Sequence, residues 1–497
     1  MNKHNIVIVG GGSAGMMAAT YCKAYWGDAV NVTVTYDHNN PGIGVGESLT
    51  PMFDTYLKRV GLTSLDIIRN CDATIKLGLK FTNWTHPGSV GYHSFPINDA
   101  QHALSPDSEH FNLVHAHSIL TNDYNNTTHY DSTYFETNTI PTTILNDRHA
   151  LQIDANKLGR FLEWYAKDTL TIIDGIVKTV STNGNNIESI TLEDGSLIKA
   201  DLFIDCSGYQ RVLINELSPD WVDLSNELTT DRTIPNPLFK EFDTLPCYTT
   251  AEATKNGWIL DVPLTTRHGT GYVYSSKFTS DEEAKQEFNN WLVKKYGVEL
   301  QSDRVIKYAN GYFTNPWIGN CLALGLSSSF IEPLEATSIH HLVFSLEQFA
   351  MQYNLKQIDY NNRLYNNIIS EYYANSFKYI RFFYDTDRTD SEFWKYLTNN
   401  KPEWLVELNE KLSTGFLDQN SLGFAAKMFQ PADFLSIAQA HGKFEDTSGI
   451  DSYLSNKHLH NLAKLDTDKI NQIKRSKLQQ VISHEQWIRN VLNNINT

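Results

Sequence analysis

The sequence contains few cysteines, and none of them has the CxxC spacing of a metal or redox site. The five, Cys22, Cys71, Cys206, Cys247 and Cys321, are scattered over 497 residues. An odd number at irregular spacing indicates neither a disulfide framework nor a zinc site. We therefore expect a protein of a reducing compartment.

Long apolar runs and an excess of basic residues are also missing. No stretch approaches the roughly 18 apolar residues of a membrane span, and the N-terminus lacks the apolar region of a secretory signal. Lys+Arg 41 against Asp+Glu 57 gives a formal charge of −16, which disfavours nucleic acid and anionic membranes as partners. These absences predict a soluble, cytoplasmic protein without a nucleic-acid or membrane partner.

Histidine is plentiful, but it does not form a metal-ligand pattern. The histidines between 100 and 130 stand in polar surroundings without paired acids, which is not the usual ligand set. They are His102, His110, His115, His117 and His129. No metal site is expected.

The first 37 residues have the pattern of a βαβ unit. Asn5 to Val9 read as a buried strand, Ala14 to Trp26 as a helix, and Asn31 to Tyr36 as a second strand. A strand, a helix and another strand at this spacing are typical of an α/β fold with a mainly parallel sheet.

The turn GGGSAG, Gly10 to Gly15, matches the dinucleotide-binding pattern in its proper context. Gly10 permits the tight turn, Gly12 lets the backbone approach a pyrophosphate, and Gly15 allows the helix to pack closely on the strand. The helix start at Ser13 and Ala14 offers free amides to phosphate. Asp37, which ends the second strand, would accept from a ribose hydroxyl.

Other glycine turns favour FAD over NAD as the bound nucleotide. Gly208 in DCSG and Gly325 in LALG each follow a strand, and GIGVGES occupies 42–48. A flavin needs several close backbone approaches along its length. Because no second nucleotide fingerprint follows, reducing equivalents are expected from a separate flavin reductase.

The rest of the chain contains a polar segment, two strand-like segments and a helical segment. Residues 85–150 are polar and suggest loops over a pocket, while Leu197 to Cys206 read as one buried strand and 258–280 alternate like strands. From about 345 onward apolar residues recur at helical steps, which predicts amphipathic core helices. One such series is Ile369, Tyr372, Tyr373, Phe377, Ile380 and Tyr384.

These motifs together resemble the flavin-dependent halogenases, specifically the tryptophan-halogenase-like group. The likeness covers roughly 1–100, 145–215 and 255–395, and includes GGGSAG, GIGVGES, TIKLGLKFTNW, DLFIDCSG, GTGYVYSSKFTS, GLSSSFIEPLE and DTDRTDSEFW. The resemblance implies an FAD-binding, Rossmann-like and aromatic-hydroxylase-like domain with mixed sheets, joined to a mainly helical C-terminal region. It also implies that FADH2 and O2 oxidise a halide to hypohalous acid.

Residue by residue, the resemblance places the family's catalytic lysine on Lys76 and its glutamate on Glu335. The flavin strap falls on Gly42 to Thr50, with Gly44, Gly46, Glu47 and Ser48 as cofactor-binding candidates. In one strand of period two, Lys76, Gly78, Lys80 and Thr82 would share a face. That face is either solvated or holds the working amine, with Lys80 as a secondary candidate. Lys76 could donate a hydrogen bond to hypohalous acid or form a haloamine, and Glu335 could take the arene's proton.

Two signatures depart from the family. Its WxWxIP motif is here Trp258 to Pro263, WILDVP, so Leu260 replaces the second tryptophan and Trp258 either screens the flavin or only packs in the core. After Glu335 the usual Ser and Gly are Ala336 and Ser338. The amides of Thr337 and Ser338 could hold the halide, and the altered loop suggests a preference for bromide or iodide over chloride.

The substrate is predicted to be a small electron-rich arene. His93 and Phe95 in GYHSF match pocket positions of the family, where aromatic faces can sandwich an arene; either could instead be a core residue. The region that grips the amino-acid part of free tryptophan has no recognisable counterpart between Leu397 and Gly442. Free tryptophan is therefore disfavoured.

The expected domain boundaries follow from these assignments. Residues 1–84, 145–215 and 300–350 are assigned to the FAD-binding domain, 85–144 and 216–299 to a substrate-side sheet with loops, and 351–497 to the helical region. Two alternatives stay open, namely a flavin monooxygenase or reductase on the same fold and a non-catalytic flavin-binding protein. The sequence also leaves open whether the chain forms a homo-oligomer.

Overall fold

The computed structural model describes residues 3–39, 46–99, 108–123, 125, 127–239, 244–355, 362–413, 417, 421–444 and 446–493. The chain divides into two compact units. The first comprises Met1–Ala73, Ile153–Leu228 and Tyr308–Ala374, and the second Thr74–Gln152, Thr229–Lys307 and Asn375–Thr497. The domain boundaries expected from the sequence stay a prediction.

The first unit is built on a sheet whose central strands are parallel. In β1, Ile6, Val7, Ile8 and Val9 are all buried, as expected for a parallel sheet that is covered on both faces. In spatial order the strands are β21 (Trp317–Ile318), β22 (Cys321–Ala323), β13 (Leu202–Asp205), β1 (His4–Val9), β2 (Val30–Tyr36) and β9 (Thr171–Asp174). Only the β21–β22 pair is antiparallel in this sheet.

Helices and two small sheets cover the first unit. One face of the main sheet packs on a cluster that includes Val7, Phe203 and Leu213. The helices are α1 (Ser13–Trp26), α2 (Met52–Val60), α3 (Ser64–Asn70), α7 (Ala155–Tyr165) and α9 (Thr337–Gln352). The small sheets are β10 (Val177–Asn183), β11 (Asn186–Leu192) and β12 (Leu197–Ile198), and β14 (Trp221–Asp223), β20 (Gly311–Phe313) and β23 (Ser329–Phe330).

The second unit contains a mixed sheet of seven strands. Helix α8 (Asp281–Tyr296) packs on it through Phe288 and Leu292, which contact Ile259 and Tyr272. In spatial order the strands are β19 (Ile306–Lys307), β15 (Arg232–Leu238), β18 (His268–Tyr274), β17 (Gly257–Pro263), β16 (Thr249–Ala253), β5 (Gly78–Thr82) and β6 (Val90–Ser94). All neighbouring pairs are antiparallel except β16 with β5.

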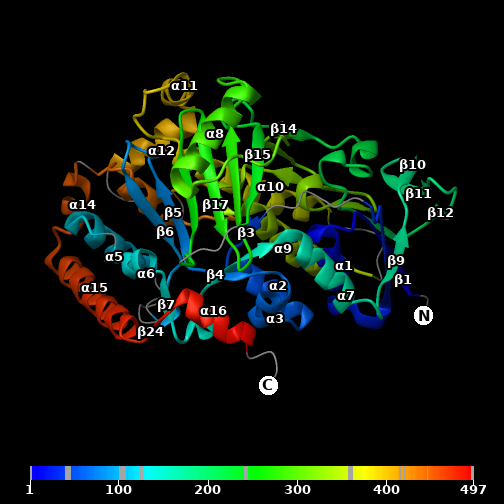
Figure 1. The fold of residues 1–497 in the computed structure, drawn as a ribbon, viewed down its shortest axis with the longest axis horizontal. Coiled ribbons are helices and arrows are strands. Elements are labelled where there is room, and N and C mark those ends of the chain that lie inside the picture. The colour runs from blue at the N-terminus through cyan, green and yellow to red at the C-terminus, as the bar shows by residue number, and fades with distance from the viewer. Residues whose placement is uncertain are drawn as a thin grey trace. The chain divides into compact units, whose positions relative to one another are not determined.

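The remainder of the second unit is mainly helical. Helices α5 and α15 run side by side (Figure 1). The helices are α5 (Ser108–Thr121), α6 (Ser132–Thr137), α11 (Glu392–Asn399), α12 (Glu403–Ser413), α13 (Pro431–Ala440), α14 (Ser448–Tyr453), α15 (Lys457–Leu478) and α16 (His484–Asn493). Short pairings join β4 (Thr74–Lys76) to β8 (Ala150–Asp154) and β7 (Thr139–Pro141) to β24 (Val481–Ser483).

The predicted helical stripe on the later part of the chain is confirmed. Helix α10 (Asn362–Phe383) buries Ile369, Tyr372, Tyr373, Phe377 and Ile380, and Tyr384 follows its last turn in a buried position. The predicted first strand, helix and second strand are likewise present as β1, α1 and β2.

Three local predictions are wrong. Leu197 to Cys206 is not one strand, because β12 and β13 belong to different sheets and the exposed Lys199 lies between them. The strand predicted through Lys76 and Thr82 is also two, because β4 pairs with β8 whereas β5 pairs with β16 and β6 in another sheet. The segment 85–150 does not consist only of loops over a pocket, because it contains helix α5, whose Leu113 and Val114 are buried core residues.

Candidate active site

Three glycine turns meet at the carboxyl edge of the first unit's parallel sheet. They follow β1, β13 and β22, which are neighbours in the sheet. A Cβ on Gly10 would lie 2.3 Å from Cys206 O, and a Cβ on Gly325 would lie 3.0 Å from the Ala14 Cβ. Segments more than 300 positions apart in the sequence thus come together at one edge, as ligand-binding turns of open α/β sheets do.

The turn between β1 and α1 has the shape of a diphosphate cradle. Gly10 has φ +114° and a Cβ on Gly15 would lie 1.8 Å from Gly10 O, so neither position admits a side chain. Nothing lies within 4 Å of a Cβ on Gly12. No side chain caps the start of α1, so its first amides can serve an anion. The Ser13 hydroxyl itself donates to Ala155 O at 2.7 Å.

The end of β2 supplies the acid expected beside this cradle. Asp37 follows Tyr36, the last residue of β2, and is only partly exposed. Its Oδ1 accepts from the Asn39 amide at 2.9 Å. A carboxylate has a second oxygen that can also accept a hydrogen bond, which suits a ribose hydroxyl. Together with the cradle, these residues fit FAD.

Asp205 joins two of the glycine turns, and the motif analysis missed it. The buried carboxylate accepts from the Ser207 amide and hydroxyl, from the Ser327 hydroxyl, and from the amides of Leu213 and Ile214. Ser327 also donates to Gly208 O at 3.1 Å. In the sequence, the only indication of this hydrogen-bond network was an acidic residue at the end of an apolar strand.

We expect Asp205→Asn to weaken FAD binding, because an amide nitrogen cannot accept from the amides of Leu213 and Ile214. Leaving buried donors unpaired costs about 1–3 kcal/mol, so FAD affinity should fall by roughly tenfold or more. Quenching of flavin fluorescence measures the affinity. Asp194→Asn, in an exposed turn of the same unit, is the control and should bind FAD normally.

The described part of the flavin strap is a short strand tied to helix α9. Gly44 lies outside the described residues, whereas β3 (Gly46–Ser48) is present, with Gly46 and Ser48 buried. Burial raises the pKa of Glu47 to about 7. The Thr50 hydroxyl and His340 Nδ1 form a hydrogen bond of 2.7 Å, and His340 Nε2 lies 2.6 Å from the Tyr372 hydroxyl.

Thr50 and His340 are a second contact that sequence reasoning missed. The adjacent pair His340 and His341 directly after the Glu335 loop was a possible signal for it. Because His340 is bonded on both nitrogens, it fixes the strap against α9.

Most of the loop from Glu332 to Ser338 is buried. Glu332 is 0% and Glu335 6% exposed. Ala336 adopts a left-handed conformation at φ 58°, and α9 begins immediately after it at Thr337. The Thr337 hydroxyl is buried and has no hydrogen-bond partner among the described residues. A bare hydroxyl at a helix N-terminus suits a small anion.

In the second unit, Lys76 is buried rather than solvated. It ends β4, is 2% exposed, and its Nζ lies 5.5 Å from the centroid of the Phe95 ring. Lys80 is half-buried between the rings of Tyr92 and Tyr248, at 5.9 and 5.5 Å, and burial lowers its pKa. Since β4 and β5 lie in different sheets, the two lysines do not share a strand face.

The two candidate substrate residues have different surroundings. His93 is buried, with Nε2 at 3.2 Å from Asp433 Oδ1 and Nδ1 at 3.2 Å from the Tyr379 hydroxyl. Phe95 is only half-buried and carries the ring beside Lys76. Phe95 is therefore the more available of the two for an arene.

The WILDVP segment forms β17, where Trp258 is fully buried. Asp261, its fourth residue, accepts from His268 Nδ1 at 2.7 Å and pairs with Lys295 Nζ at 3.2 Å. Burial alone would raise the pKa of Asp261, but the charges of Lys295 and His268 outweigh it and hold the pKa well below its usual range.

Neither a metal site nor a membrane segment is found in the described part of the chain. No group of three or more His, Cys, Asp and Glu side chains there could hold a metal ion. His115 and His129 are buried, whereas His102 lies outside the described residues. None of the described helices has the length and apolar character needed to cross a bilayer.

Comparison with known proteins identifies the family. The tryptophan halogenase family model matches residues 5–449. Tryptophan 7-halogenase RebH of Lentzea aerocolonigenes is 30% identical over 417 residues, 78% of this chain and 78% of that protein. The crystal structure of tryptophan 6-halogenase SttH of Streptomyces toxytricini superposes with a TM-score of 0.87 at 25% identity, covering 98% of this chain and 99% of that one.

A further solved structure gives the same result. Tar14, a tryptophan C-6 flavin-dependent halogenase from taromycin biosynthesis, has a TM-score of 0.86 at 25% identity and covers 99% of this chain and 100% of its own. The chain belongs to the tryptophan halogenase family.

It is therefore an enzyme, a flavin-dependent halogenase that uses FADH2, O2 and a halide to halogenate aromatic compounds. Halogenases of this kind work with a separate flavin reductase. The prediction of an FAD-binding, Rossmann-like α/β fold with mixed sheets is confirmed.

Proposed function

We propose that this halogenase acts on an electron-rich arene other than free tryptophan, with Lys76 presenting the electrophilic halogen and Glu335 accepting the arene's proton. The observation that carries the proposal is the burial of Lys76 beside the ring of Phe95, 5.5 Å from Nζ. A lysine on a solvent-facing side of a strand would be exposed. A buried amine next to a half-buried aromatic ring fits a site that receives an arene.

The cofactor residues belong to the same proposal. Gly10, Gly12, Gly15 and the amides of Ser13 and Ala14 would hold the FAD diphosphate, and Asp37 the ribose. Gly208, Gly325, Gly44 and the strap residues Gly46, Glu47 and Ser48 would line the rest of the cofactor. Reduced FAD and O2 supply the two-electron oxidation that converts halide to hypohalous acid.

Lys76 can transfer the halogen to the arene by either of two routes. As an ammonium, Lys76 gives a proton to the oxygen of hypohalous acid while the arene attacks the halogen, so that water leaves. As a neutral amine, Lys76 takes the halogen with loss of water and then passes it to the arene. In both cases Glu335 takes the arene's proton and a proton returns to the Lys76 nitrogen, so that the net products are the aryl halide and water.

The substrate proposal rests on the departures from tryptophan-specific relatives. RebH and SttH are tryptophan halogenases, but here the second tryptophan of the WxWxIP motif is Leu260, within a buried strand. His93 is engaged by Asp433 and Tyr379, which leaves Phe95 as the proposed aromatic face for the arene. Indoles and phenols without an amino-acid tail are the compounds to try first.

One experiment tests the function directly. The full chain is supplied with a flavin reductase, NADH, FAD, O2 and each halide, over a panel of phenols, indoles and free tryptophan. Halogen isotope patterns are then sought by mass spectrometry. We expect organohalogen from phenols or indoles. Product that needs no halide, or turnover of tryptophan alone, would contradict the proposal.

We also propose that Thr337 and Ser338 hold the halide. Thr337→Val removes one hydrogen bond to an anion, worth about 1.5–3 kcal/mol, so the halide KM should rise roughly tenfold or more. Because the hydroxyl has no partner among the described residues, the melting temperature should not fall. Thr20→Val is the matched control, since its buried hydroxyl is bonded to Met16 O at 2.7 Å. It should lose stability and keep the halide KM. A Thr337→Val enzyme with unchanged halide KM would refute the assignment.

The altered loop after Glu335 leads to a prediction about the halide itself. Ala336 and Ser338 replace the usual Ser and Gly, and heavier halides are easier to oxidise. With equal chloride and bromide in one reaction, brominated product should dominate by mass spectrometry. A clear excess of chlorinated product would remove this proposal.

A cytoplasmic location, favoured by the free thiols, is proposed as well, and cell fractionation would test it.

A further inference from the structure

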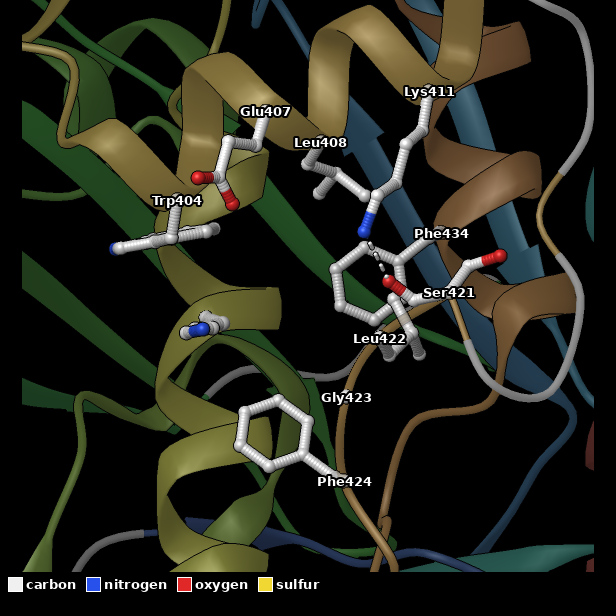
Figure 2. Close-up of a pocket in the computed structure, with 10 residues that line it drawn as sticks. Trp404, Glu407, Leu408, Lys411, Ser421, Leu422, Gly423, Phe424 and Phe434 are labelled. Carbon is white, nitrogen blue, oxygen red and sulfur yellow. Dashed lines mark hydrogen bonds between the residues drawn. The ribbon is translucent and has the colours of Figure 1, made fainter.

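A pocket in the second unit stands apart from every residue assigned above. It has a volume of about 250 Å³ and opens between helix α12 and the segment that carries Phe424 (Figure 2). Its wall contains the residues Lys378, Trp404, Glu407, Lys411, Phe424 and Phe434. None of them takes part in the proposed halogenation.

Aromatic rings form most of the apolar wall. Trp404 projects from α12 on one side and Phe424 lies on the other (Figure 2). The Phe434 ring is buried at 1% exposure, which makes it a fixed surface of the pocket. Rings in this arrangement offer flat faces and edges to a planar ligand.

Two amines and one carboxylate set the charge of the pocket. Lys378 Nζ lies 5.2 Å from the Trp404 ring centroid and 5.0 Å from that of Phe424. Lys411 Nζ donates to Ser421 O at 2.9 Å, and Glu407 is the one acid among the described residues that line the pocket. These described lining residues therefore carry a net positive charge within a chain whose formal charge is −16. A concave cationic surface on an acidic protein selects for anions that can also enter an apolar space.

We propose that this pocket binds a small aromatic carboxylate of one or two rings. The carboxylate would pair with Lys378, and the ring would lie against Trp404 and Phe424. Size agrees, since a dry cavity of roughly 150 Å³ holds benzene and this pocket is larger, at about 250 Å³. The proposal is independent of the halogenation chemistry, because it requires neither flavin nor halide.

A purely structural role for Lys378 leads to a different expectation. Lysine stems often lie on aromatic rings while the ammonium stays in water. In that case the pocket would treat a carboxylate and its neutral amide alike, because the ammonium would make no contact with the ligand. Preference for the charged ligand therefore separates the two accounts.

Calorimetric titration of the full chain with indole-3-acetate and with indole-3-acetamide provides the test. We expect the carboxylate to bind at least about tenfold more tightly, as a charge-assisted hydrogen bond implies. Lys378→Met keeps the apolar stem and should remove that preference, while Lys378→Arg should retain most of it. Trp404→Ala should weaken both ligands.

Lys395→Met is the matched control. Lys395 lies on helix α11, is about half exposed, and pairs with Glu392 of the same helix at 2.8 Å. It should bind both ligands as wild type does. Equal affinity for acid and amide, no binding of either, or a Lys378→Met variant that keeps the preference would each overturn the proposal. Melting temperatures close to that of the wild type would show that the variants are folded. Halogenation of a neutral phenol should be unchanged in Lys378→Met. Loss of halogenation in the wild type would instead count against the proposed function alone.

Discussion

Lys76→Ala is expected to abolish organohalogen formation while FAD binding and NADH-dependent flavin oxidation continue. Lys76 is 2% exposed and lies in the second unit, whereas the glycine turns that fit FAD lie in the first. Removing the amine should therefore leave the cofactor residues intact. General acid or nucleophilic groups contribute about 10²–10⁴-fold, so product measured by mass spectrometry should fall by at least about 100-fold.

Lys80 provides the control for this experiment. It carries the same side chain, is half-buried between Tyr92 and Tyr248, and lies four residues further along the chain, in β5. Lys80→Met should keep most of the activity. Because truncation to alanine could leave a cavity around β4, Lys76→Met, which retains the stem, should be tested beside it and should be equally inactive. Full activity in Lys76→Met would end the assignment of the working amine, even if Lys76→Ala were unstable.

The parts of the fold that sequence predicted well are those fixed by local chemistry. The βαβ unit followed from a buried apolar run, a glycine turn and an amphipathic helix, each of which is decided by neighbouring residues. The turn at Gly10 was predictable from the local glycine pattern between a strand and a helix, and its φ of +114° agrees with that prediction. The buried stripe of α10 likewise needed only the helical period.

What could not be predicted depends on contacts between distant segments. The break at Leu77 exists because β4 pairs with β8 whereas β5 pairs with β16 and β6 in another sheet, and no feature of the sequence near Leu77 indicates those partners. Asp205 and Ser327 meet across 122 positions, and Thr50 and His340 across 290. Periodicity gives the face of a strand or helix, but it does not say which segment will lie against that face.

A third contact of this kind lies at the end of α10, around Asp385. The side chain of Asp385 is 0% exposed, and its carboxylate pairs with Lys401 at 2.7 Å and Lys443 at 2.6 Å. Asn409 donates to the same carboxylate at 2.7 Å. Burial alone would raise the pKa of Asp385, but the two ammonium groups and Asn409 outweigh it and lower the pKa. One buried carboxylate thus ties α12 and the segment after α13 to the end of α10.

Asp385→Asn should destabilise the protein by about 3–5 kcal/mol, because it leaves two ammonium groups beside a neutral side chain. Chemical denaturation at pH 7 measures the loss. Since the folded pKa of Asp385 is lowered, its contribution is complete above the unfolded value of about 3.9 and is lost as the pH falls through the folded value. The difference from wild type should therefore stay constant down to about pH 5 and shrink only below about pH 3.9. Glu392→Gln makes the same chemical change in an exposed pair, where the carboxylate is 78% exposed, and should cost less than about 1 kcal/mol. A difference for Asp385→Asn as small as that of Glu392→Gln would mean that packing alone holds α12 and the end of α10 together.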